Sequence, residues 1–517
     1  MNILFIMYDQ LRFDYLSCAG HPHLHTPNFD RVAARGVRFT NAYVQSPICG
    51  ASRMSFYTGR YVASHGSTWN QVPLSVGEWT IGDHLRPLGV DVALAGKTHM
   101  VADLEGMARL GISPTDGDGV TLAQCGFNAH IRDDGLHPDS SVNPDLAYNR
   151  YLNAQGYAGD NPWHDWANSA EGPLGEILSG WYWRHSNLPA RVRAEHSETP
   201  WMTDQALDYI RGRGDAPWCL HLSYIKPHWP YMAPAPYHAL YGPDDVKPAN
   251  RTDTERQDPH PVVGAFMDHD EGRTYARPEA RDTIIPAYMG LIRQLDDEIG
   301  RLMAELDRLG RLDDTLIVLT SDHGDYLGDH WLGEKELFHD ESVKIPLIIR
   351  HPDNAGGRVC DALVEAIDLL PTFVDGLGGC LPDTRLEGRS LLPFISGHPP
   401  EEWRDTAVSE LDYSHRRARR VLNQPKARCR AWMLRDRDWK YIHYQGFRPQ
   451  LFHMREDPAE QQDLAGHPEH QDRIREFGER LFTWLACDRK LRVTLDDAAV
   501  ELRTDSWKKK GVIFGEW

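Results

Sequence analysis

The sequence contains few cysteines, and no two of them lie close together. Its eight cysteines are scattered over 517 residues, and none belongs to a Cys-x-x-Cys pair. This spacing disfavours both a structural zinc site and a disulfide framework. Isolated cysteines are typical of a reducing compartment, so we expect the protein to be cytoplasmic.

Long hydrophobic runs and excess positive charge are also lacking. No apolar run approaches the roughly 20 residues that a membrane-spanning helix needs. Residues 2–7 are apolar except for Asn2, but the segment is too short for a secretion signal and has neither a basic region nor a cleavage site. The formal net charge of -19 disfavours a nucleic acid or an anionic membrane as partner, because either requires a basic face. We therefore expect neither partner.

The composition is that of a globular protein with a sizeable core. Hydrophobic residues make up 41% of the chain and charged residues 25%. At 517 residues, the chain exceeds a single ordinary domain.

Four short apolar runs read as buried strands, and each is followed by polar residues. Residues 3–7 precede Asp9 and Gln10, residues 91–95 precede Lys97 and His99, residues 218–224 precede His228, and residues 315–320 precede Asp322 and His323. Ligands of open α/β sheets collect at the carboxyl ends of the strands. We therefore expect these side chains to meet in one cavity.

The polar residues after the first and last of these strands are suitable metal ligands. Asp9, Gln10 and Asp322 offer oxygen atoms, which hard divalent cations prefer. The imidazole of His323, as a ligand, makes manganese as plausible a bound ion as calcium. A solvated turn would explain Asp9 alone, but the later Asp-His pair favours one divalent metal ion.

Residues 49–60 combine a candidate nucleophile with a fixed cation. Cys49 is followed by Ser52 and Arg53, and the run closes on Thr-Gly-Arg. An isolated cysteine is more often a buried structural thiol, which is the alternative reading here. We expect a helix to follow Cys49, so that its positive N-terminal dipole favours anions near the nucleophile.

The pattern Cys-x-Ala-Ser-Arg-x-x-x-x-Thr-Gly-Arg resembles the signature of the sulfatase family, with Ala51 where that family most often has proline. Further elements in family order strengthen the resemblance: Asp9-Gln10, Gly96-Lys97-Thr98-His99, Lys226-Pro227-His228, Asp322-His323 and Lys335. In sulfatases a maturation enzyme oxidises the cysteine to formylglycine, an aldehyde whose hydrate attacks the ester and forms a covalent intermediate.

The resemblance implies a role for each of these residues. It implies metal ligands at Asp9, Gln10, Cys49, Asp322 and His323, catalytic roles for Cys49, Arg53, His99, His228 and Lys335, and substrate contacts from Lys97, Asn70 and Thr98. The implied cofactors are one calcium or manganese ion and the formylglycine made from Cys49.

The resemblance also implies a sulfatase or alkaline-phosphatase-like α/β fold. We expect a catalytic domain over residues 1–385, with a large and mostly parallel sheet flanked by helices. A smaller α+β domain with an antiparallel sheet should occupy residues 386–517 and end in an arm that contacts another subunit of a dimer or tetramer. Residues 101–200 read as an irregular insertion that walls the substrate pocket, and residues 242–281 as a second surface excursion.

Two helices are predicted with clear boundaries. Thr26 and Pro27 should start a helix that runs to about residue 35. Apolar residues at helical spacing predict another over residues 288–306, with Asp296, Asp297 and Glu298 on its solvated face.

The favoured function is hydrolysis of small-molecule sulfate monoesters, because Lys97 and His99 complete the donor set typical of sulfatases. The alternative is a phosphonate monoester hydrolase or phosphodiesterase, and we expect cross-activity between the two. Two other hypotheses are a non-catalytic metal-binding protein and a thiol enzyme that uses unmodified Cys49.

Overall fold

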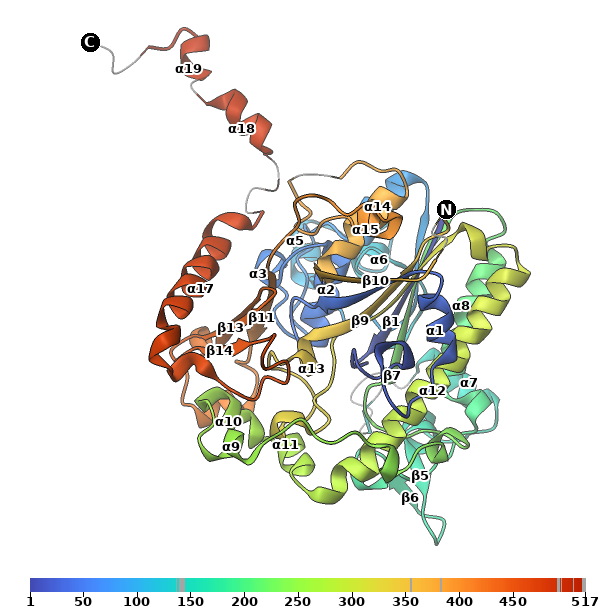
Figure 1. Cartoon of the computed structure of the whole chain (residues 1–517). Helices are drawn as coiled ribbons and strands as arrows, with labels where there is room; N and C mark the ends of the chain where they lie inside the picture. Colours follow the sequence, from blue (N-terminus) through green and yellow to red (C-terminus); the bar gives the residue numbers. More distant parts are fainter. Residues whose placement is uncertain are drawn as a thin grey trace.

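The computed structural model of the chain describes residues 1–135, 137–138, 145–353, 356–381, 384–490, 493, 495–504 and 506–513. A large sheet lies at its centre between two layers of helices (Figure 1), with strand order β10-β2-β9-β8-β1-β7-β3-β4. Only β9 runs antiparallel to its neighbours β2 and β8, so the mostly parallel sheet is confirmed. The strands are β1 (Asn2–Asp9), β2 (Val37–Tyr43), β3 (Asp91–Gly96), β4 (Asn128–Arg132), β7 (Trp218–Pro227), β8 (Thr315–Ser321), β9 (Lys344–Arg350) and β10 (Arg358–Glu365).

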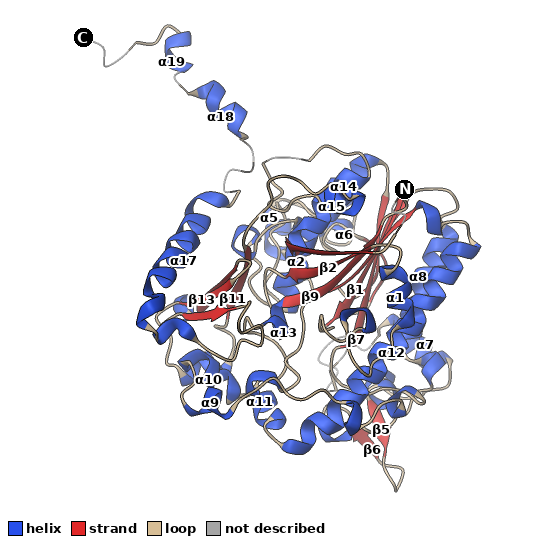
Figure 2. Ribbon diagram, in the orientation of Figure 1, coloured by secondary structure: helices blue, strands red, loops and turns tan. Residues whose placement is uncertain are grey.

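Strand β1 lies in the middle of the sheet and is buried on both faces. Phe5 and Met7 belong to the core on one face, whereas Ile6 and Tyr8 belong to the core on the other. Alternate residues of a strand point to opposite faces, which explains why this run is apolar throughout. One layer contains α2 (Cys49–Thr58), α4 (Ile81–Leu85) and α14 (Leu369–Gly376), and the other contains α1 (Pro27–Ala33), α8 (Glu198–Gly212) and α12 (Pro278–Arg308). Figure 2 shows these helices in blue on both sides of the red strands.

Helix α12 is longer than the sequence pattern predicted, and its charged residues are not all solvated. It begins at Pro278, a residue suited to the first helical turn, instead of residue 288. Asp296 is fully buried and Glu298 is 6% exposed, so the prediction of a solvated face is wrong for both. Asp296 accepts hydrogen bonds from the backbone N–H groups of Asn28 (2.8 Å) and Phe29 (2.9 Å). These groups lie in the first turn of α1, where N–H groups have no partner within the helix.

The two excursions are more regular than predicted. The first contains α5 (Leu104–Arg109), α6 (Asp118–Leu122), α7 (Ala147–Ala154) and the hairpin strands β5 (Ser169–Glu171) and β6 (Ile177–Ser179). It also supplies β4, which extends the main sheet beside β3. The second contains α9 (Asp253–Gln257), α10 (Pro261–Met267) and α11 (Asp270–Tyr275). These elements are short, and the periodicity of such segments is too brief to recognise in a sequence.

A second, four-stranded sheet is antiparallel, as predicted for the C-terminal part. It consists of β11 (Ala407–Asp412), β12 (Arg430–Arg435), β13 (Trp439–Tyr444) and β14 (Gln450–His453). Helix α17 (Gln471–Thr483) covers it through Phe477 and Leu481. The remaining helices of the described chain are α3 (Val62–His65), α13 (Asp340–Val343), α15 (Leu392–Ser396), α16 (Arg417–Val421), α18 (Asp497–Arg503) and α19 (Ser506–Lys509).

The C-terminal arm stands away from the body. Figure 1 shows α18 and α19 projecting beyond α17. Val512 and Ile513 are exposed, and the last part of the predicted apolar tip, residues 514–517, lies outside the described residues. Among the residues that the structure describes, no helix has the length and apolar character needed to cross a bilayer.

Candidate active site

The carboxyl ends of the parallel strands bring the candidate residues to one edge of the main sheet. Asp9 ends β1, Asp322 and His323 follow β8, Lys97 follows β3 and His228 follows β7. Because β1 lies between β7 and β8, residues more than 300 positions apart in the sequence become neighbours. The convergence expected from the strand ends is therefore present.

Cys49 is the first residue of α2 and lies against this group. Its Sγ is 3.0 Å from Nε2 of His323 and 3.9 Å from Oδ1 of Asp9. All ten residues of α2 are buried. The helix therefore holds the sulfur in a fixed position. The N–H of Gly50 is taken by Oδ1 of Asn70 at 2.8 Å.

Four buried side chains form a cluster that fits a divalent cation. Ligand atoms of Asp9, Cys49, Asp322 and His323 all lie within 4.8 Å of one another. Nδ1 of His323 donates to the carbonyl of Gly324 at 2.9 Å, which leaves Nε2 free to bind a metal. Burial lowers the pKa of His323 despite the nearby carboxylates, so the ring is neutral, which is the form of imidazole that can bind a metal.

Positive charges keep Asp9 ionised. Burial alone would raise its pKa, but the cations Lys97 and Arg53 outweigh this effect and hold the pKa well below its ordinary value. Nζ of Lys97 is 2.5 Å from Oδ2 of Asp9. An ionised carboxylate is the form that ligates a cation, so the donor set is ready for one.

Arg53 connects helix α2 with the carboxylates of the buried cluster. Its Nε donates to Oδ2 of Asp322 at 2.8 Å, and its Nη2 lies 3.4 Å from Oδ2 of Asp9. Its Nη1 donates to the hydroxyl of Ser223 at 2.7 Å and to the carbonyl of Lys97 at 3.0 Å. The guanidinium is fully buried, and every one of these contacts fixes its orientation.

Gln10 is held beside the cluster, with its amide turned towards other residues. Its Nε2 donates to Asp325 and to the hydroxyl of Tyr231, and its Oε1 accepts from Nζ of Lys335 at 3.2 Å. Metal ligation by Gln10 stays a prediction.

A cavity of about 530 Å³ opens above the cluster. The basic residues Lys97, His99, His228 and Lys335 line it together with Cys49. Nδ1 of His228 donates to the carbonyl of Trp229 at 2.7 Å, so its Nε2 faces Nζ of Lys335, 3.3 Å away. Burial, followed by the neighbouring lysines, lowers the pKa of His228 well below its ordinary value, although Asp9 opposes the shift.

Two predicted substrate contacts have different positions. Asn70 lines the cavity. Thr98 is fully buried, is not among the residues that line the cavity, and accepts the N–H of Met100 on its hydroxyl at 3.4 Å. Its own N–H donates to Asp134, which also accepts the N–H of His99.

Several lining residues were missed in the sequence. Trp69 and His415 stack with ring centroids 5.5 Å apart, and Arg416 and Glu334 complete that wall. His415 and Arg416 come from the loop after β11 in the C-terminal region, and no local pattern connects them with Cys49. Asp325, which binds Gln10, lies two residues after His323, but no sequence pattern assigned it a role.

Fold and site together define an ester hydrolase of the alkaline phosphatase superfamily. The comparisons with known proteins make this more specific. The family model named Sulfatase matches residues 1–379, so the chain belongs to the sulfatase family. A second model, for the C-terminal region of N-sulphoglucosamine sulphohydrolase, matches residues 328–486.

The chain is similar to curated hydrolases over nearly its whole length. It is 31% identical to the multifunctional alkaline phosphatase superfamily protein PehA of Trinickia caryophylli, over 93% of this chain and 95% of that protein. It is 26% identical to an arylsulfatase of Clostridium perfringens, over 92% of each chain.

A solved structure shares the fold closely. The phosphonate monoester hydrolase from Silicibacter pomeroyi superposes with a TM-score of 0.84 at 29% identity, over 96% of this chain and 97% of that one. The family implies the formylglycine and the metal ion, and the buried cluster is a possible site for that ion.

Proposed function

We propose that this chain hydrolyses sulfate monoesters of small molecules, with a formylglycine made from Cys49 as nucleophile. One observation carries the proposal: Lys97, His99, His228 and Lys335 line the same cavity as Cys49. A sulfate ester presents a tetrahedral anion, and donors fixed where negative charge develops are usually the largest catalytic contribution. Sγ of Cys49 stands in for an oxygen of the hydrated aldehyde.

In this proposal, Asp9, Gln10, Cys49, Asp322 and His323 hold one calcium or manganese ion. A divalent cation, when bound, acts as a Lewis acid that polarises the ester oxygens. Arg53 orients the nucleophile through its contacts with Asp322 and Asp9.

The remaining candidate residues have two proposed roles, binding of the anion and action on the leaving oxygen. Lys97, Lys335, Asn70 and Thr98 bind the anion, with Thr98 the least supported because it lies outside the cavity lining. His99 and His228 are proposed to act on the leaving oxygen. The neutral ring of His228 carries its proton on Nδ1, which donates to the carbonyl of Trp229. Its Nε2 would therefore accept a proton from solvent first and then deliver that proton to the leaving oxygen.

Hydrolysis of phosphonate monoesters and phosphodiesters is the second candidate. The close superposition on a phosphonate monoester hydrolase favours it. Both ester classes present tetrahedral anions to the same basic cavity, so one of them is expected as a side activity.

Turnover of two esters with the same leaving group separates the candidates. We expect a higher kcat/KM for para-nitrophenyl sulfate than for para-nitrophenyl phenylphosphonate, measured on metal-loaded enzyme with a known formylglycine content. A preference for the phosphonate would assign the chain to the second candidate. Chelation should remove activity towards both esters, and calcium or manganese should restore it.

The proposal extends to the domain division, location, maturation and oligomeric state of the chain. We propose a division into a catalytic domain over residues 1–385 and a smaller domain over 386–517, a cytoplasmic location, a separate maturation enzyme for Cys49 and a homo-oligomer. All eight cysteines are free, which supports a reducing compartment. Native mass spectrometry of the full chain tests the oligomer, and a monomeric mass would remove it.

A further inference from the structure

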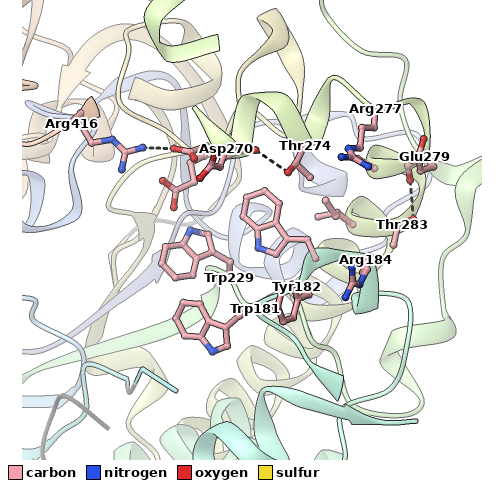
Figure 3. Close-up of a pocket in the computed structure, with 15 residues that line it drawn as sticks. Trp181, Tyr182, Arg184, Trp229, Asp270, Thr274, Arg277, Glu279, Thr283 and Arg416 are labelled. Atoms are coloured by element: carbon pink, nitrogen blue, oxygen red, sulfur yellow. Dashed lines mark hydrogen bonds and ion pairs between the residues drawn. The ribbon is translucent and has the colours of Figure 1, made fainter. Parts of the chain in front are cut away.

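A second cavity adjoins the one that contains Cys49. Its volume is about 560 Å³, and it lies among α11, the start of α12 and the segment after β6 (Figure 3). Trp181, Trp229, Glu334 and Arg416 line both cavities, so the two spaces share a wall. An ester that places its anion at Cys49 can therefore extend its leaving group towards this second space.

Glu334 stands at this junction with no partner for its carboxylate. It is 8% exposed, and within the described chain its side chain accepts no hydrogen bond and forms no ion pair. Its backbone has φ of +60° and is held by the N–H of Tyr326, which donates to its carbonyl at 2.7 Å. Because Glu334 lines both cavities, its carboxylate is open to a ligand that supplies a partner.

The nearby carboxylates differ from Glu334 in this respect. Arg416 forms ion pairs with Glu271 and with Glu336, the latter at 2.9 Å. Figure 3 shows the guanidinium of Arg416 directed towards α11, the helix that carries Glu271. Lys335 and Arg416 feel the charge of Glu334, yet neither is close enough to form an ion pair with it. The free carboxylate is therefore available to a bound molecule.

Aromatic rings line the same two cavities as Glu334. The indoles of Trp181 and Trp229 lie 5.2 Å apart at an angle of 67°, and Trp183 lines the second cavity beside them. In the part of the chain that the structure describes, neither N–H group of this indole pair has a hydrogen-bond partner. The faces of such rings attract cations, tryptophan most strongly.

We propose that Glu334, Trp181 and Trp229 form a leaving-group subsite for an alkylammonium group. The inference rests on the proposed function, because it places the ester anion at Cys49. The substrate would then be a zwitterion with its anion among the lysines and its cation at Glu334. A chain with a net charge of -19 repels a purely anionic ester at long range but does not repel a zwitterion.

Two aryl esters that differ only in charge test the subsite. One has a trimethylammonium group at the end of a short para substituent, and the other has the neutral tert-butyl group in its place. We expect the wild-type kcat/KM to favour the cationic ester by about tenfold. Glu334→Gln should reduce this ratio to one or below, whereas Glu279→Gln, which alters an exposed carboxylate at the rim, should keep the wild-type ratio.

The outcomes separate this inference from the proposed function. Equal rates for the two esters in the wild type, or an unchanged ratio in Glu334→Gln, would overturn the subsite and leave the hydrolase proposal intact. If neither ester is hydrolysed, the hydrolase proposal fails, and direct binding decides the subsite.

Calorimetric titration with phenyltrimethylammonium measures that binding without turnover. We expect the full-length protein to bind it, and Glu334→Gln and Trp181→Leu each to weaken binding about tenfold. The second substitution alters a half-buried side chain on another segment, so a folding defect in one variant does not remove the test. Absence of binding to the wild type, or binding by both variants as tight as that of the wild type, overturns the proposal. Preference for a neutral hydroxylated ligand would also overturn it.

Discussion

At the scale of single residues, the position of Cys49 matters more than its reactivity as a thiol. The sulfur lies within reach of Asp9 and His323, and the first turn of α2 holds it there. Arg53, one turn further along the same helix, fixes Asp322 on the opposite side of the cluster. A single helix therefore carries both the proposed nucleophile and the arginine that contacts the proposed metal ligands.

The substitution Cys49→Ser is expected to lower kcat at least about a thousandfold, because it removes the precursor of the nucleophile. Intact-mass measurement should show the wild-type chain lighter than its sequence by about 18 Da, the change from cysteine to formylglycine, and the variant should lack this difference. Cys380→Ser, at an exposed position, is the matched control and should retain full activity. Full activity in the Cys49 variant would exclude the proposed chemistry.

At the scale of elements, helix α1 depends on α12 for its N-terminal cap. The carboxylate of Asp296 accepts the N–H groups of Asn28 and Phe29 and the side-chain amide of Asn28. Thr26, predicted as the N-cap, makes no capping hydrogen bond with its side chain. The cap therefore comes from a residue far along the chain.

Asp296→Ala should lower the free energy of unfolding by about 1–3 kcal/mol, because buried N–H groups would lose their acceptor. Urea unfolding measures this change. The adjacent Asp297→Ala removes a carboxylate whose side chain is 37% exposed, and its effect should be smaller. Equal effects of the two substitutions would show that the capping carboxylate of Asp296 stabilises the protein no more than the exposed carboxylate of Asp297 does.

The loop between β8 and α13 contains a buried histidine that the sequence left unassigned. His330 lies between Glu255 of α9, at 2.6 Å, and Glu341 of α13, at 3.5 Å. Burial alone would lower the pKa of His330, but the two carboxylates raise it to about 10. The charged imidazole therefore ties the second excursion to the body of the protein.

The ion pairs of His330 make the free energy of unfolding depend on pH in a defined direction. Because the folded pKa of His330 is raised, its contribution is fully present below the unfolded value of about 6.5. It is lost as pH rises through about 10. In urea unfolding between neutral pH and about pH 11, the wild type should lose a few kcal/mol that His330→Gln does not lose.

The control for this comparison is His467→Gln, because the side chain of His467 is 54% exposed. Its unfolding profile should follow that of the wild type. Parallel profiles for the wild type and the His330 variant would contradict the assigned ion pair.

At the scale of the whole molecule, the small sheet supports the active-site loop. Lys440 of β13 is fully buried, and its Nζ binds the carbonyl of Phe338 at 3.0 Å. It also lies 2.7 Å from Asp340 and 2.7 Å from Glu460. The segment that carries Lys335 therefore rests on a cation from the C-terminal region.

Lys440→Met should destabilise the protein by about 3–5 kcal/mol, because it leaves the buried carboxylate of Glu460 without its cation and removes one of the two lysines that pair with Asp340. Thermal unfolding measures the loss, and kcat should fall with it because the Lys335 segment loses its support. Lys344→Met removes a more exposed lysine that also pairs with Asp340, at 3.3 Å, and should cost less. An unchanged kcat in Lys440→Met would separate the small sheet from catalysis.

The sequence alone determined the elements whose signal is local. Continuous apolar runs predicted the central strands because a strand covered on both faces has no polar side. The polar residues Asp9, Lys97, His228 and Asp322 were found because each follows one of these apolar runs. The helix that begins at Cys49 was predicted as well, and the resemblance to sulfatases implied the antiparallel C-terminal sheet.

Tertiary structure alone decided what depends on contacts between distant segments. Asp296 looked solvated until α1 packed against it, and β4 became a strand only because β3 offers it an edge. The free carboxylate of Glu334 has meaning only beside Trp181 and Trp229. Burial and partners of a polar group arise from the packing of the whole chain, and local residue patterns do not encode them.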